Sequence, residues 1–307
     1  MQLYYRKPIG IIYQHNPQLN PVLKELFRRG IDIDILDPSD CAFDPALTEL
    51  SYSLLFNDLS LPPYFKRKNS ALNQAIEYVR HVESLNPSAR IINGSRASEI
   101  LCNRTRQLSL FARLKIPFPR TRIVSSSDQL LAAANELKFP ILLKSNQVDD
   151  PVSALVFENV SDLIVALVNN KVAVASGKAT VIQELVPAKG NYTIRAEIVN
   201  GKVLYAFRIY HVLRPGRVPL EVKAESVTPS PEIIRVIENI TRASLIDIGS
   251  IEYVMHKESN AILFTELRPH TSVFNITIEG LQINPIEQLA NYIERRHQKV
   301  REIALAI

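Results

Sequence analysis

The chain has 307 residues and a net charge of +5, and 46% of its residues are hydrophobic. This composition excludes a disordered or fibrous protein, and the length predicts two or three subdomains. The Lys and Arg residues are dispersed among acidic ones without a basic and aromatic array, so the sequence does not favour a nucleic acid as a partner.

The first residues, MQLYYRKPIGIIYQ, lack the long apolar segment and cleavage site of a secretory signal. No apolar run elsewhere approaches the roughly 20 residues that a helix needs to cross a bilayer. We therefore expect a cytoplasmic protein that does not enter a membrane.

Residues 1–92 show the pattern of an open parallel α/β domain. PIGIIYQ predicts a buried strand, the segment around Leu23, Leu26 and Phe27 predicts a helix, and IDIDILDP predicts a second strand. Strand, helix and strand with short joints form a βαβ unit. YSLLFNDL, a helix over about 71–84 and ARIIN extend it. No glycine-rich dinucleotide fingerprint follows the first strand.

Residues 93–180 predict a mixed subdomain. One helix is expected from Ser95 to Lys115, before Pro117, and another in SSSDQLLAAANELKF. FPILLKS and SALVFEN predict a strand pair, VSDLIVALVNN predicts a helix, and ATVIQELV predicts another strand.

Residues 181–307 predict a further subdomain with antiparallel strands. YTIRAEIVNGKVLYAFRIYH predicts a hairpin that turns at Asn200 and Gly201. A helix over 232–244, the strands GSIEYVMH and AILFTELRP, and a helix over about 285–300 follow. The fold class is thus an α/β domain followed by two α+β subdomains.

Five segments in this order resemble the ATP-grasp superfamily, most closely its glutamate-ligase-like branch, over about residues 90–300. They are NRTRQLSLFARLKIPFPRT, FPILLK, QELV, YTIRAEIVNGKVLYAFRI, and GSIEYV followed by FTELRP. The resemblance makes residues 1–92 a pre-ATP-grasp domain, 93–180 the N-terminal (lid) subdomain and 181–307 the C-terminal subdomain.

The resemblance also implies a function. Such proteins use ATP and Mg²⁺ to convert a carboxylate into an acyl phosphate, which an amine then attacks. We therefore expect an ATP-dependent carboxylate-amine ligase whose partners are a small-molecule or peptide carboxylate and an amine. A homo-oligomer is left open.

The resemblance assigns the nucleotide site. Arg104 and Lys144 match phosphate-binding positions, and Gln183, Glu184, Leu185 and Val186 match the strand that meets the adenine edge. Each of these residues could instead have an ordinary structural role. Lys144 could be a solvated strand end, Arg104 could belong to a surface helix face, and the QELV strand could be plain core.

Reaction and metal residues follow in the same way. Arg195 and Arg208 match catalytic positions on the hairpin, and Glu252 and Glu266 match the two acids that hold magnesium. The alternative for both pairs is exposed strand charges. His211, Arg214 and Arg217 occupy a segment that binds substrate in relatives, although Pro215 and Gly216 also read as a simple turn.

Three departures from the family pattern weaken the expectation of catalysis, of which Thr193, in place of an acid two residues before Arg195, is the mildest. The lid segment SNQVDDPVSA contains no glycine, although backbone amides must approach phosphates closely there. Arg268 stands where relatives have an asparagine metal ligand. It predicts one Mg²⁺ ion rather than two, an ion pair with Glu252 or Glu266 in the absence of nucleotide, or a substrate contact. The competing hypothesis is a non-catalytic ATP-grasp descendant that serves as a nucleotide-binding regulatory or interaction module.

Overall fold

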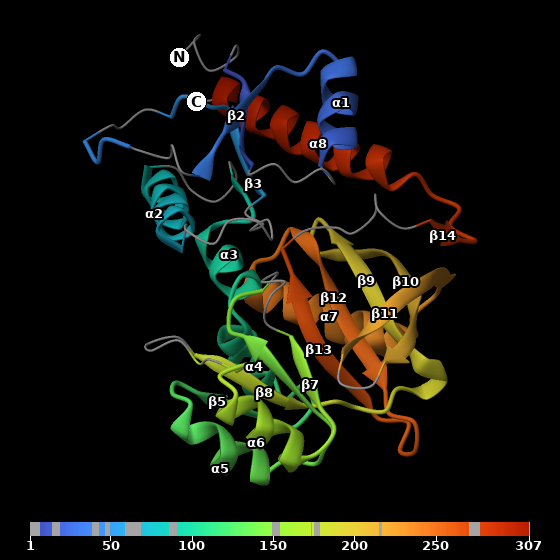
Figure 1. The fold of residues 1–307 in the computed structure, drawn as a ribbon. Coiled ribbons are helices and arrows are strands. Elements are labelled where there is room, and N and C mark those ends of the chain that lie inside the picture. Colours follow the sequence, from blue (N-terminus) through green and yellow to red (C-terminus); the bar gives the residue numbers. More distant parts are fainter. Residues whose placement is uncertain are drawn as a thin grey trace.

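The computed structural model describes residues 7–13, 19–38, 43–46, 50–58, 69–85, 91–148, 154–172, 174, 179–214, 217–269 and 277–306. These residues form three sheets with helices packed against them (Figure 1). Within this part of the chain, no helix is long and apolar enough to span a membrane.

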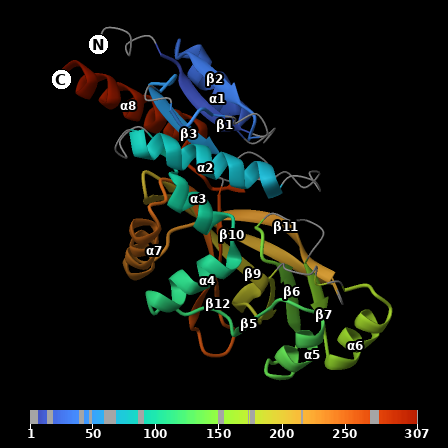
Figure 2. The same cartoon turned by 90° about the vertical axis from the view of Figure 1, so that its left-hand side faces the viewer.

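The N-terminal sheet is parallel, with the strand order β2-β1-β3-β4. Its elements are β1 (Ile9–Tyr13), α1 (Asn20–Arg28), β2 (Ile33–Leu36), β3 (Leu54–Asp58), α2 (Asn69–Leu85) and β4 (Ile91–Ile92). Helix α2 covers one face, and α1 covers the other together with α8 (Pro285–Ala306) (Figure 2). Both faces of the central strands β1 and β3 are buried, and these strands are largely apolar, whereas the edge strand β2 is partly exposed. The predicted open parallel α/β arrangement is confirmed.

Helix α8 packs against this first sheet, far from it in the chain. Leu289 and Ile293 share a core with Ile9 of β1, and Arg29 after α1 forms an ion pair of 2.8 Å with Glu294. The sequence analysis assigned α8 to the C-terminal subdomain, residues 181–307. The boundaries at residues 92 and 180 stay a prediction, but α8 lies on the N-terminal sheet.

The second sheet is antiparallel, with the order β5-β8-β6-β7, and it shares a core with α5 and α6. The elements of this region are α3 (Ser95–Leu101), α4 (Arg104–Arg113), β5 (Thr121–Val124), α5 (Asp128–Asn135), β6 (Ile141–Ser145), β7 (Leu155–Phe157), α6 (Val160–Val168) and β8 (Thr180–Glu184).

The single helix expected from Ser95 to Lys115 is wrong, because Asn103 divides it into α3 and α4. Asn103 is extended, with φ −135° and ψ 108°. Its side-chain oxygen accepts a hydrogen bond of 3.0 Å from the backbone N–H of Arg106 and so caps α4. This break places Arg104 at the start of a helix.

The third sheet is the largest, with the order β13-β12-β9-β10-β11-β14, and all its pairs are antiparallel except β11 with β14. Its region contains the 3-10 helix Lys189–Asn191, β9 (Tyr192–Val199), β10 (Lys202–Arg214), β11 (Arg217–Val227), α7 (Pro231–Ser244), β12 (Ile248–Met255), β13 (Ile262–Arg268) and β14 (Ile278–Glu279). One face packs on α3, α4 and α7. The predicted hairpin turn is present, with φ 57° at Asn200 and 67° at Gly201.

Candidate active site

A row of charged side chains crosses the face of the largest sheet that is opposite α7. Glu266 on β13 is in register with Glu252 on β12, which is in register with Arg195 on β9. Residues in register on neighbouring strands point to the same face. Their chain neighbours Ile194 and Ile251 lie on the opposite face, in the core with α7. The sheet therefore brings together three of the predicted site residues.

Arg195 holds Glu252 closely. Its Nε and Nη2 donate to Glu252 Oε1 at 2.8 and 2.5 Å. Arg195 is only 4% exposed and Glu252 9% exposed. A bond between two charged groups shielded from water is stronger than a surface ion pair.

Arg268 joins both carboxylates. It follows Glu266 by two positions on β13 and therefore points to the same face. Its Nε donates to Glu252 Oε1 at 2.8 Å, and its Nη2 lies 3.1 Å from Glu266 Oε2. The predicted ion pair of Arg268 with these acids is confirmed.

Arg104 approaches from the start of α4. Its Nε and Nη2 lie 2.6 and 2.5 Å from Glu266 Oε1. Its Nη1 donates to the backbone oxygens of Ser145 and Gln147 at 2.8 and 2.5 Å. One arginine thus connects the largest sheet to the chain that leaves β6.

Lys144 completes what we call the charge cluster: Arg104, Lys144, Arg195, Glu252, Glu266 and Arg268. Burial lowers the pKa of Lys144, and its carboxylate neighbours oppose this. Burial alone would raise the pKa of Glu252 and Glu266, but the surrounding arginines hold both pKa values below the usual range. Four basic side chains face two carboxylates, so the cluster carries a formal charge of +2 with Lys144 protonated. It suits an anion.

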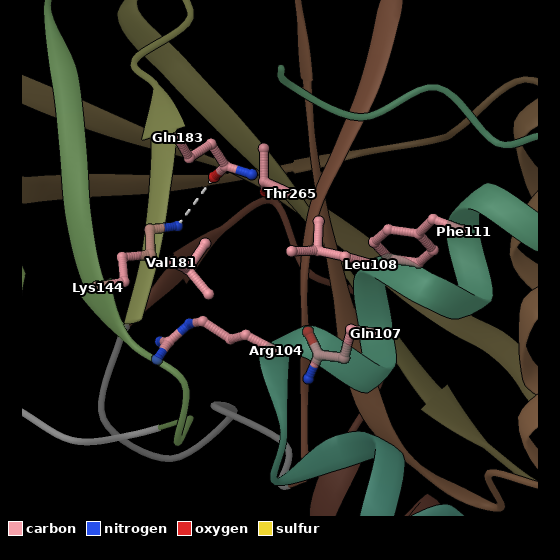
Figure 3. A pocket seen from close by; sticks show the side chains of 8 residues that line it. All are labelled: Arg104, Gln107, Leu108, Phe111, Lys144, Val181, Gln183 and Thr265. Carbon is pink, nitrogen blue, oxygen red and sulfur yellow. Dashed lines mark hydrogen bonds between the residues drawn. The ribbon is translucent and has the colours of Figure 1, made fainter. Parts of the chain in front are cut away.

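A pocket opens beside the charge cluster, between α4 and the second sheet (Figure 3). Figure 3 shows Lys144 from β6 and Gln183 from β8 joined by a hydrogen bond of 3.3 Å. The lining residues are Arg104, Gln107, Leu108, Phe111, Lys144, Val181, Gln183 and Thr265. Its cavity volume of about 10 Å³ is room for roughly one water molecule and lies far below the roughly 300–1,000 Å³ of ordinary ligand pockets. A nucleotide therefore needs the second sheet and α4 to move apart.

The carboxylates as arranged do not fit a metal ion. Three of their four oxygens accept from arginine: Oε1 of Glu252 and both oxygens of Glu266. Among the described residues, no group of three or more His, Cys, Asp or Glu side chains is placed to hold a metal. Divalent cations take oxygen ligands that are free to coordinate. The assignment of Glu252 and Glu266 to a metal stays a prediction that requires Arg268 to move.

The expected adenine segment continues from β8. Gln183 lines the pocket and is 4% exposed. Glu184 accepts a bond of 2.9 Å from the Lys138 N–H, and the Leu185 N–H donates to the Pro140 oxygen at 2.9 Å. These bonds hold the segment against β6. Its role toward adenine, with Val186, stays a prediction.

Arg208 does not join the cluster. Phe207 is in register with Arg195, so Arg208 points to the opposite face, beside Ile194. Its guanidinium carbon lies 5.2 Å from the centre of the Tyr192 ring. The geometry does not support the catalytic role predicted for it.

His211 lies on the cluster face because it follows Phe207, the partner of Arg195, by four positions on β10. Its Nε2 lies 3.0 Å from Thr193 Oγ1. Arg214 and Arg217 are in register where β10 and β11 meet, but their side chains lie outside the described residues. Of the lid segment SNQVDDPVSA, residues 145–154, the structure describes 145–148 and 154, so most of the segment lies outside the described residues.

Glu221 and Gln107 are among the residues of the site that were not predicted. Glu221 on β11 has an oxygen 3.7 Å from Arg195 Nη2. Gln107 is 2% exposed, and its side chain bonds to both the N–H and the backbone oxygen of Leu267, which fixes α4 against β13. Residues three apart on a helix lie on the same face, so the spacing of Arg104 and Gln107 could have indicated that Gln107 belongs to the site.

Comparisons with known proteins agree on one fold. The family model described as the RimK-like ATP-grasp domain matches residues 102–293. A RimK domain ATP-grasp protein from Sphaerobacter thermophilus is 15% identical with a TM-score of 0.61, over 85% of this chain and 90% of that one. No curated protein sequence matches significantly.

Two further solved structures are similar. The ATP-grasp ligase PsnB, complexed with a phosphomimetic variant of its minimal precursor, Mg and ADP, is 13% identical with a TM-score of 0.67, over 94% of this chain and 98% of that one. The D-cycloserine synthetase DcsG is 14% identical with a TM-score of 0.66, over 94% and 99%. At these identities the likeness shows the fold.

Proposed function

Because this chain belongs to the RimK-like ATP-grasp family, we propose that it is an ATP-dependent ligase that joins a carboxylate to an amine through an acyl phosphate. The observation that carries the proposal is the charge cluster, whose four basic side chains face two carboxylates. Buried cations stabilise phosphates more strongly than exposed ones, since little water screens them.

Each basic residue has a place in this proposal. Lys144 and Arg104 line the pocket and hold the nucleotide phosphates. Arg195 and Arg268 lie further along the sheet face and neutralise charge on the transferring phosphoryl group. The segment of Gln183, Glu184, Leu185 and Val186 meets the adenine.

The proposed reaction has two steps. An oxygen of the carboxylate forms a bond to the γ-phosphorus while the bond from that phosphorus to the bridging oxygen breaks and ADP leaves. The amine nitrogen then bonds to the acyl carbon, phosphate leaves with the electron pair of the broken carbon–oxygen bond, and the nitrogen loses a proton. The protein contributes position and positive charge.

The carboxylate and amine would bind along β10 and β11, beside Arg195. His211, Glu221 and Thr193 lie on this side of the cluster. Among the similar proteins, PsnB is described in complex with a precursor peptide, and DcsG is described as a D-cycloserine synthetase. We therefore include both amino acids and peptides among the carboxylates to be assayed. A cytoplasmic location and a homo-oligomer are part of the same proposal.

The proposal assigns no step to Mg²⁺. A solved relative is described with Mg and ADP, and members of the superfamily bind ATP with Mg²⁺. In this chain the predicted single ion would need Glu252 and Glu266, whose oxygens accept from arginine.

The test is trapping of the acyl phosphate. The protein is incubated with ATP, hydroxylamine and pools of amino acids or peptides, and hydroxamate and ADP are measured together. We expect both to form with at least one carboxylate pool and to fall by more than about tenfold in Lys144→Ala, which removes a phosphate cation. Lys171→Ala, an exposed lysine after α6, is the matched control.

A second candidate is a nucleotide-binding module without catalysis. The small pocket and the paired carboxylates favour it. It predicts nucleotide binding in calorimetry with neither hydroxamate nor ADP from any pool, which would overturn the ligase proposal.

A further inference from the structure

Arg268 stands between the two carboxylates of the charge cluster. On β13 it is in register with Ser250 of β12, two positions along from the Glu252–Glu266 pair. From there its Nε reaches Glu252 Oε1 at 2.8 Å and its Nη2 reaches Glu266 Oε2 at 3.1 Å. One positive group thus connects two negative ones, as a bridging cation would.

A divalent cation and this guanidinium compete for the same oxygens. Mg²⁺ bound in proteins usually has one or two carboxylate ligands at about 2.0–2.1 Å, together with phosphate and water. Binding it to Glu252 and Glu266 would displace Arg268 and leave that charge beside the ion. Arg104 donates to Glu266 and Arg195 donates to Glu252, whereas Arg268 is the arginine of the cluster that contacts both carboxylates.

The phosphates of a nucleotide meet no such obstacle. A guanidinium carries five N–H donors in a planar fork, so it can donate to a carboxylate and to a phosphate at the same time. Arg268 has a side chain 26% exposed, against 5% for Arg195. It is therefore the arginine of the row with the most access to an incoming anion.

We propose that Arg268 replaces a protein-bound divalent cation, so that this site binds the phosphates of a nucleoside triphosphate without metal coordination by Glu252 and Glu266. This inference rests on the proposed function, since it concerns the same site. It adds that nucleotide binding is independent of Mg²⁺.

The first experiment is calorimetric titration of the whole chain with the non-hydrolysable analogue AMPPNP, in excess EDTA and in Mg²⁺. We expect a dissociation constant in EDTA no more than about threefold weaker than in Mg²⁺. Mn²⁺ alone, followed by electron paramagnetic resonance, should show no bound ion.

Two substitutions separate charge from shape. Arg268→Asn removes the cation and supplies a neutral oxygen, so binding of AMPPNP should become at least about tenfold stronger with Mg²⁺ than with EDTA. Arg268→Lys keeps the charge and should stay independent of Mg²⁺. Arg242→Asn, an exposed arginine on α7, is the matched control and should behave as the parent protein does.

The outcomes distinguish this inference from the proposed function. Binding by the parent protein that is more than about tenfold weaker in EDTA overturns the cation replacement and leaves the ligase proposal intact. Absence of AMPPNP binding in both conditions overturns both. Because the parent protein alone gives these results, an Arg268→Asn chain that fails to fold does not prevent a decision.

Discussion

Glu252 remains ionised in a buried position because Arg195 and Arg268 share its Oε1. A buried ion pair contributes little compared with an apolar pair of the same size, but loss of one partner is costly because it leaves the other charge unpaired. Removal of a charged side chain of the cluster should therefore destabilise the fold where it leaves an oppositely charged partner unpaired.

Glu252→Ala should lower the free energy of unfolding by about 3–5 kcal/mol, because two guanidinium groups lose their shared carboxylate. Urea denaturation measures this. The matched control is Glu232→Ala, which removes an exposed ion pair with Arg235 and should cost about 0–1 kcal/mol. Equal losses in the two variants would show that burial of the cluster contributes nothing.

His211 makes stability depend on pH. Burial lowers the pKa of His211, so the folded protein holds fewer protons on this group than the unfolded chain does. Stability is therefore lost as the pH falls through the unfolded value of about 6.5. We expect His211→Asn to lose less stability than the parent protein between pH 7.5 and pH 5.5 in urea denaturation. An identical loss in both proteins contradicts this assignment.

At the scale of elements, the break between α3 and α4 sets the position of Arg104. Asn103 caps α4 and also forms a bridge to Gln147 after β6. Asn103 thus connects the start of α4 to the chain that leaves β6.

Asn103→Ala should cost about 0.5–2 kcal/mol of stability and also weaken AMPPNP binding, because Arg104 loses its fixed starting point. Asn159→Ala is the control, since Asn159 caps α6 in the same way at a distance from the charge cluster. We expect it to cost similar stability in thermal denaturation and to leave binding unchanged. Equal AMPPNP affinity in Asn103→Ala and Asn159→Ala would contradict the role of the Asn103 cap in positioning Arg104.

Local patterns predicted most of the elements. The hairpin at Asn200 and Gly201 was predictable because only a few residues accept positive φ at both central positions. The Arg268 ion pair was predictable because spacing of two on a strand gives one face. The break at Asn103 was not predictable, because the residues around it favour a helix. The bridge that competes with the helix joins Asn103 to Gln147, which lies far away in the sequence.

Other features depend on contacts that no local pattern contains. Arg208 and Arg195 both lie on strands of one hairpin, but the register that puts them on opposite faces is set by the pairing itself. The ion pairs of Arg104 require the third sheet and α4 to meet. The ligand and metal roles in the cluster still await measurement.

At the scale of the whole molecule, α8 holds the N-terminal sheet to the rest of the chain. Its Leu289 and Ile293 are 3% and 0% exposed, in a core that also includes Ile248 of β12. One helix therefore contacts both the first sheet and the largest sheet.

Ile293→Ala should cost about 2–5 kcal/mol, through lost burial and the cavity left behind. Hydrogen exchange should show faster opening of β1 and β3, with β6 and β8 little changed, because α8 shares a core with the first sheet and not with the second. Gln298→Ala, exposed on the same helix, is the control. Uniformly faster exchange in all sheets would mean that the molecule opens as one unit.

The return of α8 to the first sheet also bears on how the chain folds as the ribosome makes it. Strands β1 and β3 are synthesised before the other two sheets, but α8, which together with α1 covers one of their apolar faces, is made only after all three sheets. At about 5–20 residues per second, the interval is on the order of ten seconds to a minute. During that time the face is open to other nascent chains and chaperones. The sheet that is synthesised before the other two is therefore the sheet whose core is completed last.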